Sequence, residues 1–199
     1  MTLVGFTVGD ASHATLWCDT ETYLAGKPAA QASKMAINPY AVCAGTGCGN
    51  LLLIREAGAA VTRARSTDAA VAALPAVLRG VACAGGSYGL VGYSTLLGRL
   101  VGWEFSHGAN YAARMANAWA RPHLDRFDLV DDGDALAVAQ QQLARIQLDM
   151  PDATGGALLI ATIDGDAITV RPAFNLLTGL RPTRRRQTNP PAGASTAGG

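Results

Sequence analysis

The chain has 199 residues, of which 49% are apolar and only 6% are aromatic, and its net charge is +1. This length fits one domain with a core of its own, and the near-neutral charge argues against nucleic acid or an anionic membrane as the main partner. The longest apolar runs, at residues 51–54 and 157–163, are too short to cross a bilayer, and no signal-peptide pattern opens the chain. We therefore expect a cytoplasmic protein.

Cysteine usage does not point to metal binding. The four cysteines, Cys18, Cys43, Cys48 and Cys83, form no CxxC or zinc-type spacing. In a reducing compartment such isolated cysteines are most often small buried hydrophobes. We therefore expect neither a metal site nor a thiol nucleophile.

The first half of the chain predicts strands followed by two helices. Alternating apolar residues predict strands at residues 4–8, 14–19 and 40–44, with a turn at 9–10, a polar irregular stretch at 20–33, and Gly45, Gly47 and Gly49 interrupting the third strand. A helix is expected over residues 50–65. A second helix follows the cap residues 66–68, with Ala70, Leu74, Val77 and Val81 at helical spacing.

The second half repeats this order. Residues 87–104, rich in Gly, Tyr and Val, predict two or three paired strands, and the Ala-rich residues 111–121 predict a helix. The clearest helix spans residues 134–149, where apolar residues line one face and Pro151 stops the helix. Residues 157–163 and 167–172 then predict a hairpin.

These blocks of strands and paired helices favour an α+β fold in which two packed sheets each carry a helical layer on the outside. A βαβ nucleotide-binding order fits less well, because GxGxxG does not follow the first strand and GxxxxGK(S/T) occurs nowhere in the chain. We expect one domain over residues 1–180. Residues 181–199 lack the apolar content to pack and are expected to form a disordered tail, basic at first and then rich in Pro and Gly.

The residue behind Met1 is Thr2, and it opens the first strand. A small residue at this position normally permits removal of the initiator methionine, which leaves a threonine with a free α-amine beside its hydroxyl. Such a residue holds a nucleophile together with its own base, as in N-terminal nucleophile hydrolases. The pattern gains weight from Asp19, Lys34 and Gly45 downstream.

Together these residues resemble proteasome-type β subunits. Thr2 opens a strand, Asp19 closes the second strand, Lys34 follows a polar loop, and Ala44-Gly45 ends the next strand. Further on, the sequence SHGANYA at residues 106–112 is similar to the family's Gly-Ser-Gly-x-x-Tyr-Ala segment, and Thr154-Gly155-Gly156 is similar to its Ser-Gly-Gly. The resemblance covers residues 2 to about 172. It is closest to the β-proteobacterial proteasome homologue group, with the heat-shock-locus peptidase and the ancestral β-subunit-like group as alternatives.

The resemblance implies a four-layer α-β-β-α fold and a threonine-type endopeptidase that needs no metal or organic cofactor. In that role Thr2 attacks the peptide carbonyl, and its amine, with an unperturbed pKa of about 8, takes up the hydroxyl proton. Lys34 stabilises the developing alkoxide, and Asp19 holds Lys34. The amide of Gly45 faces the oxyanion, where one donor contributes about 3 kcal/mol. Thr154 takes the place of a family serine.

Three positions depart from the family pattern. The serine of the third-helix loop falls on His107, so either Ser106 substitutes through a small loop shift, or His107 joins the site, or His107 only caps a helix. Asp149 and Asp152 compete for the place of a late aspartate. Glu21 stands where an arginine is usual in eukaryotic and archaeal subunits, and we expect this change to affect specificity.

The resemblance also implies a specificity pocket and an assembly. The pocket is lined by Ala32, by Met35 or Ala36, and by Cys43 and Gly47. These residues are small or apolar, so we expect a preference for small or apolar side chains before the cleaved bond. The implied assembly is a stack of homo-oligomeric rings, with seven subunits favoured over six, that acts on polypeptides and works with an unfoldase or activator.

Two other functions stay open at this stage. A catalytically silent ring subunit keeps the fold without the chemistry, and retention of Met1 would indicate it. An N-terminal nucleophile amidohydrolase acts on small substrates, and a monomer or dimer in solution would favour it.

Overall fold

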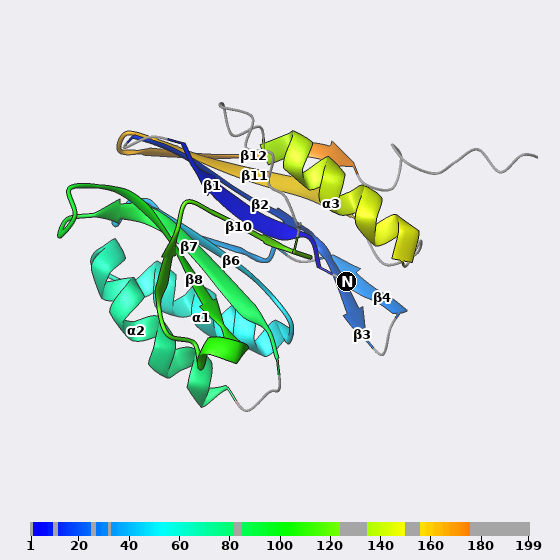
Figure 1. Cartoon of the computed structure of the whole chain (residues 1–199), viewed down its shortest axis with the longest axis horizontal. Helices are drawn as coiled ribbons and strands as arrows, with labels where there is room; N and C mark the ends of the chain where they lie inside the picture. The colour runs from blue at the N-terminus through cyan, green and yellow to red at the C-terminus, as the bar shows by residue number, and fades with distance from the viewer. Residues whose placement is uncertain are drawn as a thin grey trace, which may run out of the picture.

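The computed structural model describes residues 2–9, 12–24, 27–31, 33–81, 85–123, 135–149 and 156–175. Within these residues the chain is a mixed α+β protein with two five-stranded antiparallel sheets, a two-stranded ribbon and three α-helices. Helices α1 (Leu51–Arg63) and α2 (Thr67–Gly80) cover the outer side of one sheet, and α3 (Ala135–Asp149) covers the outer side of the other (Figure 1). This arrangement is compatible with a sandwich.

The first sheet combines strands from both ends of the described chain, whereas the second is built from five strands that follow one another in the sequence. The first sheet has the order β10-β1-β2-β11-β12, and its strands are β1 (Val4–Val8), β2 (His13–Asp19), β10 (Ala118–Arg121), β11 (Ala157–Asp164) and β12 (Ala167–Asn175). The second has the order β5-β6-β7-β8-β9, and its strands are β5 (Met35–Asn38), β6 (Cys43–Cys48), β7 (Ser87–Ser94), β8 (Arg99–Ser106) and β9 (Arg114–Ala116). The ribbon pairs β3 (Glu21–Leu24) with β4 (Lys27–Gln31).

Strands β1 and β2 of the first sheet are buried on both faces. Leu3 and Trp17 pack with Leu143 of α3 on the outer face, whereas Phe6 and Cys18 pack toward the second sheet on the inner face. This division follows from the two-residue period of a strand. The predicted alternation along residues 4–8 and 14–19 therefore separates two core layers rather than a core from solvent.

Two stacked aromatic rings belong to the core between the sheets. Phe6 and Trp119 stack with ring centroids 5.8 Å apart. A Cβ added at Gly89 would lie 2.6 Å from the Trp119 ring, and one added at Gly102 would overlap Phe6. These two glycines lie inside β7 and β8 and make room for the rings.

Helices α1 and α2 begin where the sequence predicts. The side chain of Asn50 accepts a hydrogen bond from the Leu52 amide, and that of Ser66 accepts one from the Ala69 amide, so each helix has a side-chain N-cap. Apolar residues of both helices then pack on the second sheet, among them Leu53, Ala57, Val61, Leu74 and Leu78.

The structure corrects the helix expected over residues 111–121. This segment forms the strands β9 and β10 instead. β10 pairs with β1 and places Trp119 opposite Phe6. Pairing with the edge of β1 and burial of the indole outweigh the helical propensity of the alanines, which is a weak preference.

Two strand predictions also change. The stretch at residues 20–33, expected to be irregular, includes the ribbon of β3 and β4. The strand expected at residues 40–44 begins only at Cys43, because residues 39–42 form a turn in which Val42 has a positive φ of 48°. Gly45 and Gly47 lie within β6 and do not end it.

None of the helices in the described ranges combines the length and the apolar character needed to cross a bilayer. The tail expected at residues 181–199, and the end of the expected 1–180 domain from residue 176, lie outside the described residues.

Candidate active site

The amino-terminal strand is fixed at its start by Asp19. The Leu3 amide donates a hydrogen bond to Asp19 Oδ1 at 2.9 Å, and the Asp19 amide donates one to the Leu3 carbonyl at 2.8 Å. Asp19 is the last residue of β2, which pairs with β1 along its whole length. The carboxylate therefore lies beside the residue that follows Thr2.

Lys34 reaches the same carboxylate from the second sheet. It directly precedes β5, and its carbonyl accepts a hydrogen bond from Thr46 Oγ1 at 3.0 Å. Its Nζ donates to both carboxylate oxygens of Asp19, at 2.9 and 2.8 Å, and to Thr2 Oγ1 at 3.3 Å. Lys34 and Asp19 are only 3% and 0% exposed, so each charge depends on the other for compensation.

Burial controls protonation in this cluster. Desolvation raises the pKa of the Asp19 carboxyl, while the charge and hydrogen bonds of Lys34 and the amide of Leu3 act against that rise. Burial, and then the charge of Asp19, raises the pKa of the neighbouring Cys18 thiol to about 12. Such a thiol stays protonated at neutral pH. Cys18 therefore offers no thiolate beside the Lys34–Asp19 pair.

The two glycines of β6 have different neighbours in the sheet. Gly45 lies opposite Ala36 of β5 on one side and opposite a β7 residue on the other. Gly47 lies opposite Tyr88 of β7 and beyond Met35, the first residue of β5. A Cβ at Gly45 or Gly47 would lie 2.6 or 2.7 Å from the Tyr88 side chain. Packing against this tyrosine alone therefore favours glycine at both positions.

The register also fixes where their amides point. Amide groups along a strand point alternately to its two neighbours, and the Val42 carbonyl points to β7 because it accepts a hydrogen bond from Tyr93. The amides of Gly45 and Gly47 therefore point to the β5 side. On that side Gly45 faces a paired strand, whereas Gly47 lies past its end, toward the chain segment that carries Lys34.

Ser106 and His107 are placed differently. Ser106 ends β8 opposite Ser87 and is half-buried. His107 is exposed and begins the 3-10 turn His107–Ala109, with its ring edge-on to Tyr111 at 5.9 Å between centroids. Glu104, on the same face of β8 as Ser106, bonds to the first sheet. Strand alternation therefore favours Ser106 over His107 for a role between the sheets.

The predicted pocket residues are not all brought together. Ala36 faces α1, because a Cβ added at Gly58 of that helix would lie 3.2 Å from the Ala36 Cβ. Cys43 is fully buried, and burial raises the pKa of its thiol to about 11. Four strand residues, about 13 Å, separate it from Gly47. Ala32, Thr154 and Asp152 lie outside the described residues, as do the side chains of Glu21 and Asp149.

Sequence analysis missed Gln142, a residue of α3 whose side chain bonds to β1 and β2 behind the site. Its Oε1 accepts a hydrogen bond from Trp17 Nε1 at 2.8 Å, and its Nε2 donates to the carbonyls of Val4 at 3.1 Å and Pro122 at 3.3 Å. The side chain is fully buried. A signal was present, because Gln142 occupies a position of the apolar stripe that also contains Ala139 and Ile146.

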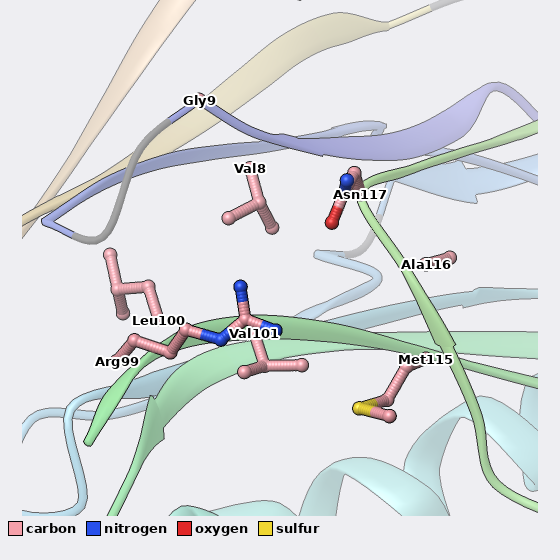
Figure 2. A pocket seen from close by; sticks show the side chains of 8 residues that line it. All are labelled: Val8, Gly9, Arg99, Leu100, Val101, Met115, Ala116 and Asn117. Carbon is pink, nitrogen blue, oxygen red and sulfur yellow. The ribbon is translucent and has the colours of Figure 1, made fainter. Parts of the chain in front are cut away.

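A hollow lies at the other end of the sheets. It has a volume of about 350 Å³ and is lined by Val8, Gly9, Arg99, Leu100, Val101, Met115, Ala116 and Asn117. Figure 2 shows the side chains of Arg99 and Asn117 directed into it from opposite walls. Val8 ends β1 whereas Thr2 precedes its start, so this hollow is separate from the Thr2 cluster.

In this cluster the Lys34 ammonium donates hydrogen bonds to the Thr2 hydroxyl on one side and to the Asp19 carboxylate on the other. Across the described part of the chain, no group of three or more His, Cys, Asp or Glu side chains could hold a metal ion.

A scan against protein-family models finds no match for this chain, and a search of curated proteins finds none either.

Proposed function

We propose that the chain is an N-terminal nucleophile hydrolase of the proteasome β-subunit type, with the four-layer α-β-β-α sandwich of that class. The observation that carries the proposal is the 3.3 Å contact of Lys34 Nζ with Thr2 Oγ1, made by a lysine that buried Asp19 holds through both carboxylate oxygens. Lysine is almost never this deeply buried unless it is paired. Here its remaining hydrogen-bonding capacity is directed at the residue behind the initiator methionine.

The chemistry begins with removal of Met1, which frees the α-amine of Thr2. That amine takes the hydroxyl proton, directly or through one water, and Oγ1 attacks the peptide carbonyl carbon to give a tetrahedral oxyanion. As this intermediate collapses, the α-ammonium returns its proton to the departing nitrogen, so that the C–N bond breaks, the new amino terminus is released as an amine, and an ester remains on Thr2. Water then hydrolyses the ester. Lys34 stabilises the alkoxide throughout, and Asp19 keeps Lys34 in place.

The oxyanion needs a backbone N–H that is not already used by the sheet. The resemblance to β subunits points to Gly45 for this role. The register supports Gly47 instead, because its amide points past the end of β5 toward Lys34, whereas Gly45 faces a paired residue. We therefore propose the Gly47 amide as the donor, with Ser106 and Thr154 orienting the Thr2 amine.

We further propose polypeptides as substrates, an assembly of stacked rings and a cytoplasmic location. An apolar surface supports the assembly. Tyr40 and Leu96 are 96% and 83% exposed, and their turns are joined by the hydrogen bond from the Tyr93 amide to the Val42 carbonyl. A neighbouring subunit that covers these side chains would remove their apolar surface from water. Native mass spectrometry should find a closed multiple of the subunit mass, and a monomer would contradict the ring.

Hydrolysis of fluorogenic peptides by protein that has lost Met1 tests the activity. Thr2→Ala should abolish hydrolysis and Thr2→Ser should retain part of it, because serine keeps the hydroxyl and the amine. Thr62→Ala is the matched control, since its exposed hydroxyl bonds only to the α1 backbone. Undiminished hydrolysis by Thr2→Ala would contradict the proposal. Among the peptides, those with acidic or basic residues before the cleaved bond should be poor substrates.

A further inference from the structure

A second ion pair joins the two sheets near Thr2. Arg121 Nη2 lies 2.9 Å from Glu104 Oε1, and the two side chains are 30% and 19% exposed. Arg121 Nε also donates to Ser87 Oγ at 3.3 Å, and Nη1 donates to the Ala120 carbonyl at 3.3 Å. Because three acceptors from both sheets meet one planar guanidinium, the contact is directional as well as electrostatic.

The two ion pairs flank the amino-terminal strand. Arg121 lies opposite Val4 on β10, one neighbour of β1, and Asp19 holds Leu3 from β2, the other neighbour. Each crosses to the second sheet, where their partners are Glu104 of β8 and Lys34 before β5. The third ion pair of the described residues, Arg55 with Glu56, lies within α1 and joins no sheets.

The second pair also reaches the strand of the proposed oxyanion donor. Ser87 Oγ, which Arg121 bonds, lies 3.3 Å from the Sγ of Cys48, the residue after Gly47. Ser87 is 4% exposed, so loss of Arg121 leaves a buried hydroxyl with one fewer donor and leaves the Glu104 carboxylate without its cation. Relaxation of these groups shifts β7 and β8 relative to β10 and β1.

Thr2 is sensitive to such a shift. Its contact with Lys34 Nζ is 3.3 Å long, at the outer limit of useful hydrogen bonds. A displacement of a few tenths of an ångström between the sheets breaks it. Misplacement of reacting groups by about 1 Å lowers rates by about a hundredfold.

We propose that the Arg121–Glu104–Ser87 contact is a positioning device for the catalytic centre, which sets the distance between Thr2 on the first sheet and Lys34 on the second. This inference rests on the proposed hydrolase function. Arg121 is a positioning residue because it acts through the placement of β1 and touches none of the groups that react.

The test compares Arg121→Met with Arg121→Lys, Glu104→Gln and the control Arg55→Met. The readout is the covalent modification of Thr2 by a peptide epoxyketone, separated into the maximal rate and the half-saturating concentration. Arg121→Met should lower the maximal rate about tenfold or more and leave the half-saturating concentration unchanged. Arg121→Lys should restore part of the rate, and Arg55→Met should match the parent protein. An unchanged maximal rate in Arg121→Met would overturn the proposal.

Amide hydrogen exchange gives a second readout that does not depend on catalysis. Arg121→Met and the milder Glu104→Gln should both speed exchange at the Leu3 and Asp19 amides, whose partners define the start of β1. Unchanged protection there would also overturn the positioning role. If the parent protein shows no adduct on Thr2 but the exchange changes as expected, the proposed hydrolase function is wrong. The Arg121–Glu104–Ser87 contact is then confirmed only as a contact that holds the start of β1 in place.

Discussion

The two ends of β1 lie in opposite chemical environments. At the Thr2 end, two ion pairs cross between the sheets, and one of them is almost completely withdrawn from water. At the Val8 end the sheets leave a hollow of about 350 Å³, where Met115 is 65% exposed and Arg99 makes no ion pair within the described residues. Within the described residues, the ion pairs that cross between the sheets thus lie at one end of β1.

This difference shows at which end of β1 the protein buries groups that lower its stability. Burying a lysine and an aspartate is rarely the most stable solution, because well-packed apolar residues of similar volume often do as well or better. Perturbed, buried titratable groups tend to lie at functional sites. The Thr2 end therefore has the character of a site retained for its chemistry, and the Val8 end that of an ordinary solvent-facing edge.

The largest effect is expected from Lys34→Met. It leaves the Asp19 carboxylate buried without a cation, which should lower the free energy of unfolding by about 3–5 kcal/mol. Arg99→Met, the matched change at the Val8 end, should alter it by less than about 0.5 kcal/mol. Urea unfolding of both variants measures the difference. Equal losses would show that the two ends do not differ in the way described.

A double variant shows whether the unpaired charge of Asp19 causes this loss of stability. Lys34→Met combined with Asp19→Leu removes both charges, so it should recover stability relative to Lys34→Met alone while hydrolysis stays absent. Failure to recover any stability would mean that Asp19 contributes mainly through its bond to the Leu3 amide.

The next largest effect is expected from Gln142→Leu. Two buried partners, the Trp17 indole and the Val4 carbonyl, and the half-buried Pro122 carbonyl lose a hydrogen bond, so unfolding should become easier by about 2–3 kcal/mol. Gln141→Leu changes the adjacent, exposed residue of α3 and is the control. Thermal unfolding of the two variants provides the comparison. A loss of similar size in both would assign the effect to helix propensity rather than to the buried amide.

The smallest effect is expected at Asp68, on the Val8 side of the second sheet. Partial burial raises the pKa of this carboxyl, but the hydrogen bonds from Ser94, Thr95 and the Leu96 amide outweigh it and hold the pKa below its ordinary value. A lowered folded-state pKa stabilises the protein above the unfolded pKa, and this contribution is lost as the pH falls through the folded pKa. Asp68→Asn should therefore cost about 1 kcal/mol or less at pH 7, and the difference should vanish in acid. A difference that grows in acid contradicts this.

Two of the three residues of the Thr2–Lys34–Asp19 cluster lie where the sequence predicts strand ends, but the groups that support the cluster could not be predicted. Thr2 and Asp19 lie next to strands that alternation predicts, whereas Lys34 precedes β5, a strand that sequence analysis did not predict, and was singled out by the family resemblance alone. The structure brings the three residues together. Gln142 bonds to residues 125 and 138 positions away, and Arg121 bonds across both sheets. Such partners depend on which strands become neighbours, which local pattern does not specify.

The same limit explains the main error in the fold. Residues 111–121 have helical composition, yet they form strands because the edge of β1 and the space beside Phe6 are available to them. The caps at Asn50 and Ser66, by contrast, act within three residues, and sequence analysis placed both helix starts correctly.

The central claim is that the hydroxyl of Thr2, held by the Lys34–Asp19 pair, is a nucleophile. The most direct test is to expose the intact protein, with loss of Met1 checked by mass, to a peptide epoxyketone and to locate the adduct by peptide mapping. We predict a single adduct on Thr2 that is absent from Thr2→Ala and from Lys34→Met. An adduct on a cysteine, or none on protein that has lost Met1, would contradict the account.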